Sequence, residues 1–206
     1  MWARGLFILA LSGLMVACAN TSPPASVDNA CAIFAERPDF YDAMADAEEK
    51  WGAPIQIQLA IMRQESSFDG KARPPRTWFL WVIPTGRKSS AYGYAQAKTD
   101  TWDWYRKDSG SGGADRDDID DAADFVGWYI AKTHTMTGVS KWDAFGQYLA
   151  YHEGQGGYQR GTWRKKSWLQ NVARKVERNA GNYGAQLQKC RKNLENERSG
   201  SWFWPF

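Results

Sequence analysis

The chain has 206 residues and carries 26 Lys and Arg against 23 Asp and Glu, a formal net charge of +3. This length fits one domain with a sizeable core, and the weak, mixed charge excludes a dedicated nucleic-acid-binding protein. The 12 Trp residues are the unusual part of the composition, because indole rings suit either a core or the apolar faces of sugar rings.

Residues 1–18 are expected to be a lipoprotein signal peptide with its acylation site, outside the fold. The apolar run from Leu6 to Val16 is shorter than the roughly 20 residues that a permanent membrane span needs. It leads to Ala17-Cys18, and this order resembles a bacterial lipoprotein signal, in which the chain is cut before the Cys and the Cys carries the lipid. The alternative is a plain secretory signal with an incidental Cys18.

The lipoprotein resemblance implies a location. Met15 departs from the pattern, which usually has Leu there, and no Asp follows Cys18. In such lipoproteins the missing Asp favours the outer over the inner membrane. We therefore expect a protein on the periplasmic face of the outer membrane of a Gram-negative bacterium, anchored through its N-terminal lipid, with residues 19–30 as a tether.

Removal of the signal leaves two cysteines, Cys31 and Cys190. In an oxidising compartment an even pair predicts a disulfide. It would tie the start of the expected domain, residues 31–196, to its last helix. A loop of this length is worth roughly 5 kcal/mol in the chain-entropy model. Two buried thiols are the alternative.

Helical signals dominate the domain, and an all-α or strongly α-dominated fold is expected. Pro38 opens one helix and Gly52 ends it, while Ile55, Leu59 and Met62 recur at helical spacing in the next. The acidic run at 115–121 supplies N-caps and a favourable charge for another. The expected helices are 38–51, one opening at Pro54, 98–108, one from the acidic run through Ile130, 142–153, and 163–196 with a break at Gly181-Asn182-Tyr183-Gly184.

Strand signals are weak. The single candidate is the aromatic and β-branched run from Trp78 to Ile83, closed by Pro84. Residues 197–206 form an aromatic C-terminal tail, which would dock on the domain, a membrane interface or a partner, or pack as core at the chain end.

The segment Glu65-Ser66-Ser67-Phe68 is the first of three with chemical potential. By itself, a Glu near a helix end is typical of a solvated surface. Glu65, however, lies four residues after Ile61 and three after Met62, at the edge of the apolar stripe. Burial there raises the pKa of a carboxyl group and keeps it protonated, as a general acid requires.

The other two segments are weak signals when taken alone. Gly93-Tyr94-Ala95-Gln96 predicts a turn before a short helix, in which Gly93 lets the backbone approach a ligand and Gln96 suits an N-acetyl amide. Ala150-Tyr151-His152-Glu153-Gly154 ends a helix. Tyr151 would place its hydroxyl beside the acid, or would equally be a core Tyr.

Together and in this order, the three segments resemble the lytic transglycosylases of the soluble (SLT) type, which have a lysozyme-like fold. The family pattern has E-S-x-F, then G-x-x-Q, then A-Y-N-x-G, and Glu65, Gly93 with Gln96, and Tyr151 match it. The resemblance covers about residues 50–160. His152 departs from it by standing where the family has Asn.

The spacing is a second departure. Gly93 follows Glu65 by 28 residues, which is longer than the usual family interval. The extra residues, from Lys71 to Ser90, would form a lid or sugar platform over the cleft, or a packed excursion.

The resemblance implies cleavage of the MurNAc-β-1,4-GlcNAc bond of peptidoglycan with formation of 1,6-anhydroMurNAc ends. Glu65 would act as acid and then as base, with no metal and no cofactor. The partner would be peptidoglycan glycan strands, bound by a monomer. The residues expected to bind substrate are Ser66, Ser67, Gly93, Tyr94, Gln96, Tyr151, His152 and Glu153.

Two other functions stay open on sequence grounds. A hydrolytic lysozyme of the same fold needs a second carboxylate to activate water, for which Glu153 and Asp69 are the candidates. A non-catalytic lipoprotein that binds glycan and tethers the outer membrane to the wall would also suit the Trp content. An adaptor in a secretion assembly that opens the wall locally is compatible with the enzyme.

Overall fold

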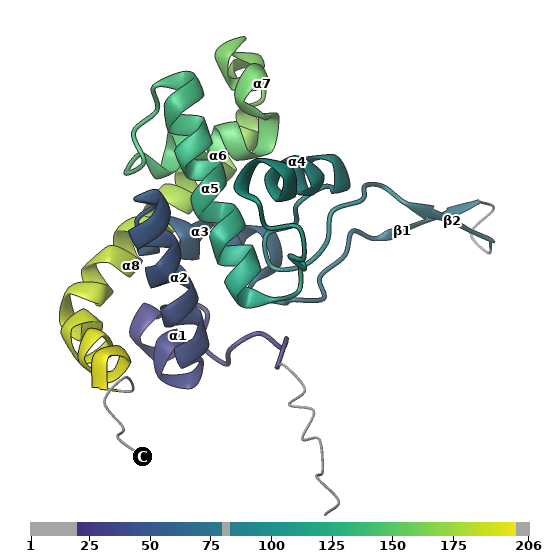
Figure 1. The fold of residues 1–206 in the computed structure, drawn as a ribbon. Coiled ribbons are helices and arrows are strands. Elements are labelled where there is room, and N and C mark those ends of the chain that lie inside the picture. The colour runs from purple at the N-terminus through teal and green to yellow at the C-terminus, as the bar shows by residue number, and fades with distance from the viewer. Residues whose placement is uncertain (1–19, 80–82, 201–206) are drawn as a thin grey trace, which may run out of the picture.

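The computed structural model of the chain describes residues 20–79 and 83–200, and the expected signal peptide and the last six residues lie outside them. The described part is mostly helical, which confirms the expected fold class. Figure 1 shows the helices gathered into one body from which a hairpin projects. The elements are α1 (Ala30–Glu36), α2 (Pro38–Trp51), α3 (Ile55–Ser66), β1 (Arg76–Phe79), β2 (Ile83–Arg87), α4 (Thr99–Ser109), α5 (Ile119–Thr137), α6 (Ala144–Glu153), α7 (Gln155–Gln159), the short 3-10 helix η1 (Thr162–Lys165) and α8 (Ser167–Gly200).

Local signals define most helix ends where the sequence predicts them. Pro38 is the first residue of α2, and Gly52, at φ 65°, ends the helix in the left-handed conformation. The side chain of Asp118 accepts hydrogen bonds from the backbone of Asp120 and Asp121 and so caps α5. The sequence did not predict α1 or α7.

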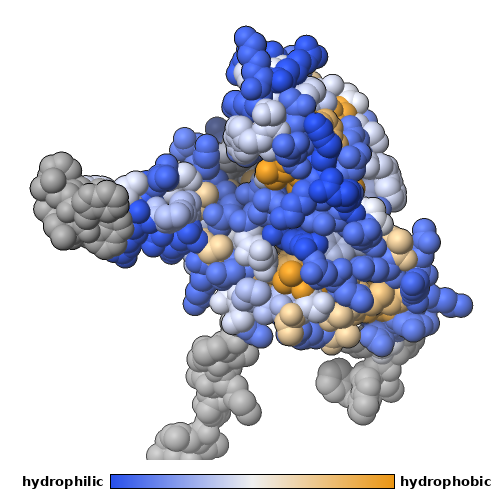
Figure 2. All heavy atoms as spheres, turned by 180° about the vertical axis from the view of Figure 1, so that it is seen from behind, coloured by the Kyte–Doolittle hydropathy of each residue, from blue (hydrophilic) through white to orange (hydrophobic). Residues whose placement is uncertain are grey.

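The core surrounds α5, which packs most extensively against α2, while α8 packs against α3 and α6. Trp128 on α5 is fully buried, and its indole N–H donates to Asp108 at 2.8 Å. Trp102 is also buried. The described surface is largely hydrophilic on the face in Figure 2, with small, separate hydrophobic patches. In the described part of the chain, no helix is long and apolar enough to cross a membrane.

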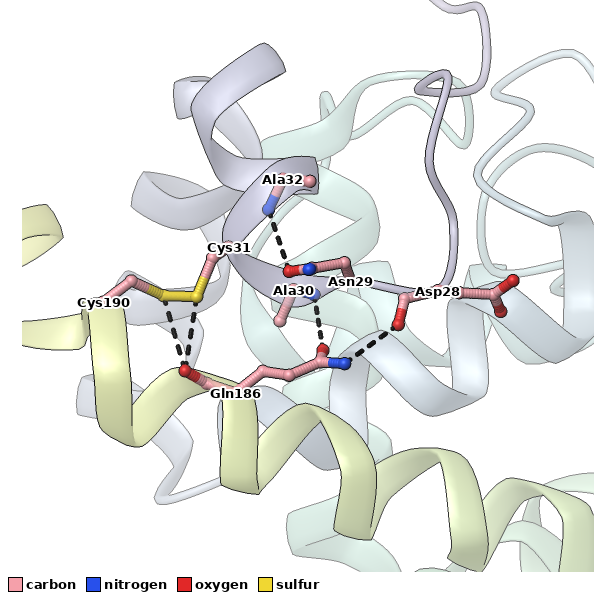
Figure 3. The surroundings of a disulfide bond; sticks show 7 residues. All are labelled: Asp28, Asn29, Ala30, Cys31, Ala32, Gln186 and Cys190. Atoms are coloured by element: carbon pink, nitrogen blue, oxygen red, sulfur yellow. Dashed lines mark hydrogen bonds between the residues drawn. A yellow bond between two sulfur atoms is a disulfide. The ribbon is translucent and has the colours of Figure 1, made fainter.

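A disulfide joins Cys31 on α1 to Cys190 on α8, as the sequence predicts. Gln186 reinforces this junction one turn earlier in α8: its side chain accepts a hydrogen bond from Ala30 N at 2.8 Å and donates one to Asp28 O at 3.1 Å (Figure 3). The N-terminal and C-terminal helices of the domain are therefore fastened to each other covalently and by hydrogen bonds.

The stretch expected to be a tether is held against the domain over its described residues. Thr21 O accepts a hydrogen bond from Gly70 N at 2.9 Å, and Ser22 O accepts one from the Arg37 guanidinium at 3.1 Å. Tyr183 on α8 donates to Val27 O. At the other end, α8 continues to Gly200, four residues into the expected tail.

The predicted break at residues 181–184 is wrong, because α8 runs through it without interruption. Glycine inside a helix costs roughly 1 kcal/mol relative to Ala. The buried face of α8, which includes Val176, Ala180, Tyr183 and Leu187, packs against the body along this stretch and outweighs that cost. The last helix also begins later than predicted, at Ser167, after η1.

The predicted single strand is replaced by an antiparallel hairpin of β1 and β2, with residues 80–82 outside the described part. Pro84 does not close a strand but lies within β2, opposite Trp78 in the register. Both strands of a two-stranded sheet are edges, and an edge tolerates the missing N–H of Pro. Figure 1 shows the described strands extending away from the helices, so they are not a packed excursion.

Candidate active site

Glu65 lies in the last turn of α3, immediately before an unusual backbone turn. Ser67 and Phe68 follow with positive φ angles of 52° and 65°, a conformation that costs free energy for residues other than Gly and that clusters at functional sites. Phe68 is fully buried and lies 6.0 Å from Phe40 between ring centroids. Packing of Phe68 therefore holds the turn and fixes the direction in which Glu65 points.

Glu65 borders a cavity of about 420 Å³ that α3, α5, α6 and the 91–101 segment enclose. Burial raises the pKa of its carboxyl group from the usual 4.5 to about 7, and hydrogen bonding by Tyr148 opposes part of this rise. Charged carboxylate is poorly stabilised where protein replaces water. A substantial fraction of Glu65 is therefore a neutral carboxylic acid near neutral pH. The cavity lining is Glu65, Ala91, Gln96, Ala97, Lys98, Thr101, Phe125, Tyr129, Tyr151, His152, Glu153 and Gly154.

Two tyrosines of α6 stand close to the acid. Tyr148 acts on Glu65 electrostatically: its hydroxyl lowers the pKa of the Glu65 carboxyl group, and burial, followed by the Glu65 charge, raises the pKa of Tyr148. Tyr151, one helical turn later, donates its hydroxyl hydrogen to Ala95 O at 2.5 Å and packs its ring on Tyr129, with centroids 4.9 Å apart. Burial, followed by the nearby Glu65 charge, raises the pKa of Tyr151 well above its usual value. The Tyr151 hydroxyl therefore stays neutral and acts as a hydrogen-bond donor.

Tyr148 beside Glu65, and the cavity-lining residues Thr101, Phe125 and Tyr129, were not predicted from the sequence as site residues. Tyr148 lies three residues before Tyr151, so the two side chains share a face of α6. That spacing was the available signal, because residues three positions apart are neighbours on the surface of a helix.

The Gly93–Gln96 turn has a structural explanation that differs from the expected one. Gly93 has φ 79°, and a Cβ there would lie 1.9 Å from Arg116 O. The absence of a side chain at Gly93 therefore lets the backbone lie close to Arg116, and not close to a ligand as expected. The Gln96 amide donates to Ala72 O and Gly93 O, both at 2.9 Å, so it holds the turn while lining the cavity.

Gly93→Ala is expected to destabilise the fold by more than Gly110→Ala, although the two glycines have nearly equal φ angles of 79° and 77°. The conformational cost for Ala, about 1 kcal/mol, is common to both. Only at Gly93 does the added Cβ overlap a backbone oxygen; nothing lies within 4 Å of it at Gly110. Chemical denaturation measures the difference, and equal free energies of unfolding for the two variants would contradict the close approach.

Four residues expected to bind substrate do not line the cavity: Gly93, which lies against Arg116 O, and also Tyr94, Ser66 and Ser67. Tyr94 is 1% exposed and packs edge-on against Phe40 at 5.6 Å, so it is a core residue. The Ser66 hydroxyl donates to Met62 O and accepts from Phe68 N, which completes the end of α3. Ser67 is exposed and forms the left-handed cap of the same helix.

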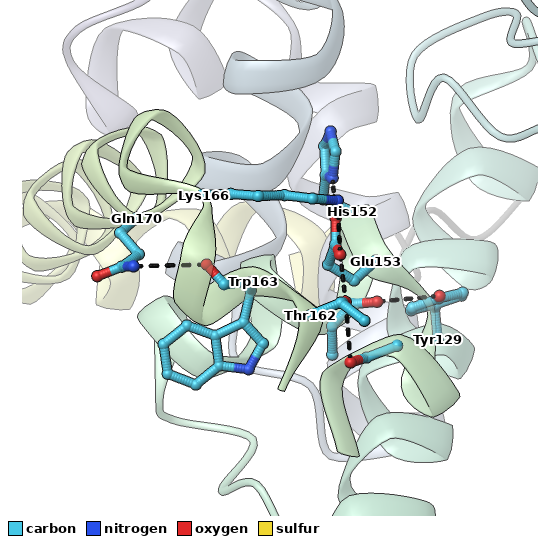
Figure 4. A network of polar contacts seen from close by, with 9 residues as sticks. Tyr129, His152, Glu153, Thr162, Trp163, Lys166 and Gln170 are labelled. Carbon is cyan, nitrogen blue, oxygen red and sulfur yellow. Dashed lines mark hydrogen bonds and ion pairs between the residues drawn. The ribbon is translucent and has the colours of Figure 1, made fainter. Parts of the chain in front are cut away.

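Glu153 lines the cavity but is already saturated with hydrogen bonds (Figure 4). Lys166 contacts both carboxylate oxygens at 2.8 Å, Thr162 donates to one of them, and His152 Nδ1 lies 3.1 Å from the other. Burial alone would raise the pKa of Glu153, but these contacts outweigh it and lower the pKa to about 2. The group is a fixed negative charge that ties the end of α6 to the segment before α8.

Asp69, the other candidate for a second carboxylate, does not line the cavity. Its side chain accepts a hydrogen bond from Lys71 N at 2.8 Å and stabilises the turn after α3. Among the described residues no group of three or more His, Cys, Asp or Glu side chains is arranged to hold a metal ion.

A family model described as "Transglycosylase SLT domain" matches residues 6–190. No curated protein sequence matches the chain.

Proposed function

We propose that this chain, which belongs to the transglycosylase SLT domain family, cleaves the MurNAc-β-1,4-GlcNAc bond of peptidoglycan and leaves 1,6-anhydroMurNAc ends. The observation that carries the proposal is Glu65, an acid with a pKa of about 7 at the wall of a cavity of about 420 Å³. An acid of this pKa is divided between its two forms near neutral pH, so the same group can serve in both proton transfers.

Glu65 acts first as the general acid. In its neutral form it protonates the O4 atom of the leaving GlcNAc as the bond from MurNAc C1 to this oxygen breaks. Positive charge develops at C1 and the ring oxygen, and the substrate's own acetamido oxygen stabilises it. Glu65 is left as a carboxylate in surroundings that favour its reprotonation.

The carboxylate then acts as the base. It removes the proton from the C6 hydroxyl of the same MurNAc, and O6 attacks C1 to close the 1,6-anhydro ring. The proton that left Glu65 in the first step is thereby replaced, so the enzyme returns to its starting form. No water molecule is consumed, and no second carboxylate is needed.

The surrounding side chains support this cycle. Tyr148 hydrogen-bonds the carboxylate form of Glu65 and moderates its pKa. Tyr151 fastens α6 to Ala95 and so positions the neighbouring Gln96. The Gln96 side-chain oxygen accepts no hydrogen bond from the described residues, and we assign it to the N–H of a substrate acetamido group.

The low pKa and the hydrogen bonds of Glu153 favour a transglycosylase over a hydrolytic lysozyme. A general base that activates water needs a free lone pair and a pKa near the working pH. Glu153 has a pKa of about 2, and both of its oxygens accept hydrogen bonds. Asp69 does not reach the cavity lining.

Digestion of purified sacculi followed by mass spectrometry of the soluble fragments tests the function. The proposal predicts muropeptides with 1,6-anhydroMurNAc ends. Reducing ends, which are heavier by one water, would identify a hydrolase, and intact sacculi would identify a non-catalytic glycan-binding protein.

The pH dependence of kcat/KM follows from Glu65, whose neutral form starts the reaction. Because this pKa is raised to about 7, activity is expected to fall as pH rises through 7. Tyr148 lowers the pKa of Glu65, so Tyr148→Phe raises it and moves the alkaline limb to higher pH. Initial rates from pH 5 to 9 measure the shift, and a limb that moves to lower pH would contradict the assigned contact.

We also propose that the mature chain begins at an acylated Cys18 on the periplasmic face of the outer membrane. The proposal rests on the sequence pattern at residues 14–18, which lie outside the described part of the structure. Mass spectrometry of the N-terminal peptide from membrane fractions tests it, and an unmodified Cys18 on the mature protein would exclude a lipid anchor.

A further inference from the structure

Among the Trp side chains whose exposure the structure describes, three are exposed, and one of them stands at the rim of the catalytic cavity. Trp104 is 37% exposed, Trp142 is 66% exposed and Trp168 is 53% exposed. Trp168 packs edge-on against His152, with ring centroids 5.1 Å apart, and His152 lines the cavity with Glu65. Trp104 instead packs on buried Trp128, and Trp142 borders a separate hollow beside α8.

The Glu153 contacts explain why Trp168 occupies this position. Glu153 follows His152 directly in the chain. Its carboxylate forms an ion pair with Lys166, which lies two residues before Trp168. The Glu153 side chain is 6% exposed and that of Lys166 is 40% exposed, so the pair is partly buried, and Lys166 contacts both carboxylate oxygens. The end of α6 and the start of α8 are thus joined at the point where the His152 and Trp168 rings meet.

The chain on the other side of Trp168 is also fixed. Leu169 is fully buried, and the Gln170 amide donates to Arg164 O at 2.9 Å. An indole that packs against His152, is flanked by fixed residues on both sides and still has about half of its surface open is a preorganised contact surface. Exposure of this area is unfavourable unless a ligand covers it.

A polysaccharide strand extends beyond a cavity of this size and must continue over its rim. The apolar face of a pyranose ring stacks well on an indole face. We propose that Trp168 is a platform for a sugar ring of the glycan strand, at the side of the cleft that His152 forms and away from the bond being cleaved. This inference rests on the proposed function and assigns a role to the Glu153–Lys166 pair, which holds the platform in place.

Binding to sacculi in an inactive background tests the platform without cleavage. The Glu65→Gln protein is compared with Glu65→Gln/Trp168→Ala, Glu65→Gln/Trp168→Phe and Glu65→Gln/Trp142→Ala by co-sedimentation with purified sacculi. Trp168→Ala is expected to weaken binding about 3- to 10-fold, the range of one aromatic stacking contact. Trp168→Phe retains most of the affinity, and Trp142→Ala, which removes a more exposed indole elsewhere, has no effect.

Kinetics in the active protein provide the second readout. Trp168→Ala is expected to raise KM for sacculi while kcat stays within about twofold, because the platform binds the strand without touching the reacting atoms. Thermal unfolding checks that each variant folds.

Each outcome bears on the platform. Unchanged binding by Trp168→Ala, or an equal loss with Trp142→Ala, overturns the platform alone if wild-type protein still releases anhydro-muropeptides. If wild-type protein releases none and the Glu65→Gln protein does not sediment with sacculi, the proposed function and the platform both fall.

Discussion

Glu65→Gln is expected to lower the rate of anhydro-muropeptide release by about 10²- to 10⁴-fold, the usual contribution of proton transfer by a positioned side chain. The amide fills nearly the same volume as the acid, but it neither donates a proton to O4 nor accepts one from the C6 hydroxyl. Both steps of the proposed cycle are therefore lost at once. Single-turnover digestion of sacculi, with the products separated and weighed, measures the loss.

The same substitution is expected to stabilise the protein above neutral pH. The pKa of Glu65 is raised from 4.5 to about 7, so the folded state binds a proton more tightly than the unfolded state does. As pH rises through this interval, ionisation of the partly buried group costs stability, up to roughly 3 kcal/mol by pH 8. Gln carries no such cost, and denaturation at pH 5 and pH 8 measures the change.

Asp69→Asn is the matched control for the catalytic variant. It removes a carboxylate four residues away that lies outside the cavity, and Asn keeps the acceptor that Lys71 N uses. Its rate is expected to stay within about twofold of wild type. Near wild-type activity in Glu65→Gln, or an equal loss in Asp69→Asn, would remove the basis for assigning the chemistry to Glu65.

Removal of the disulfide is expected to cause the largest loss of stability. The double variant Cys31→Ser/Cys190→Ser opens a cross-link between residues 159 positions apart. The chain-entropy model gives such a loop roughly 5 kcal/mol, and measured losses for native disulfides are about 2–5 kcal/mol. The Gln186 contacts with Asp28 and Ala30 remain, which favours the lower part of this range.

Chemical denaturation with and without reductant measures the disulfide's contribution. Reductant should destabilise wild-type protein by about as much as the double substitution does, and should leave the double variant unchanged. A loss below about 0.5 kcal/mol in both comparisons would mean that the hydrogen bonds and packing of α1 on α8 suffice without the cross-link.

The parts of the fold that depend on short-range signals were predictable from the sequence. Pro38 and Gly52 define the ends of α2 because their backbone preferences act locally. The register of Glu65 in α3 also follows from helical spacing, so the burial of its carboxyl group could be expected before any contact was known. The disulfide followed from the count of cysteines in a chain that was expected to be exported.

Contacts between distant segments decide the parts that were not predictable. Gly181 and Gly184 are locally unfavourable in a helix, but the buried side chains of α8 outweigh them. Tyr94 and Tyr148 are both tyrosines near a recognisable motif, yet packing sends the first into the core and the second towards Glu65.

The role of Glu153 could not be predicted either, because it depends on ion-pair partners from another segment of the chain. As a carboxylate next to a motif it was a reasonable candidate for a catalytic base. Its partners, Thr162 and Lys166, lie 9 and 13 residues further along a segment without regular periodicity. Their convergence on Glu153 depends on the path from α7 through η1 to α8, and it converts the residue from a possible base into a fixed ion pair.

The most direct test of the account is the pKa of Glu65 itself. Carbon-13 labelling of the Glu side chains and NMR titration from pH 3 to 9, with Glu65→Gln to assign the signal, measures it in the folded protein. The account predicts one carboxyl resonance that titrates near pH 7 and is missing from the variant. A Glu65 signal that titrates near 4.5 would mean that the group is solvated and ionised at neutral pH, and it would contradict its role as the acid.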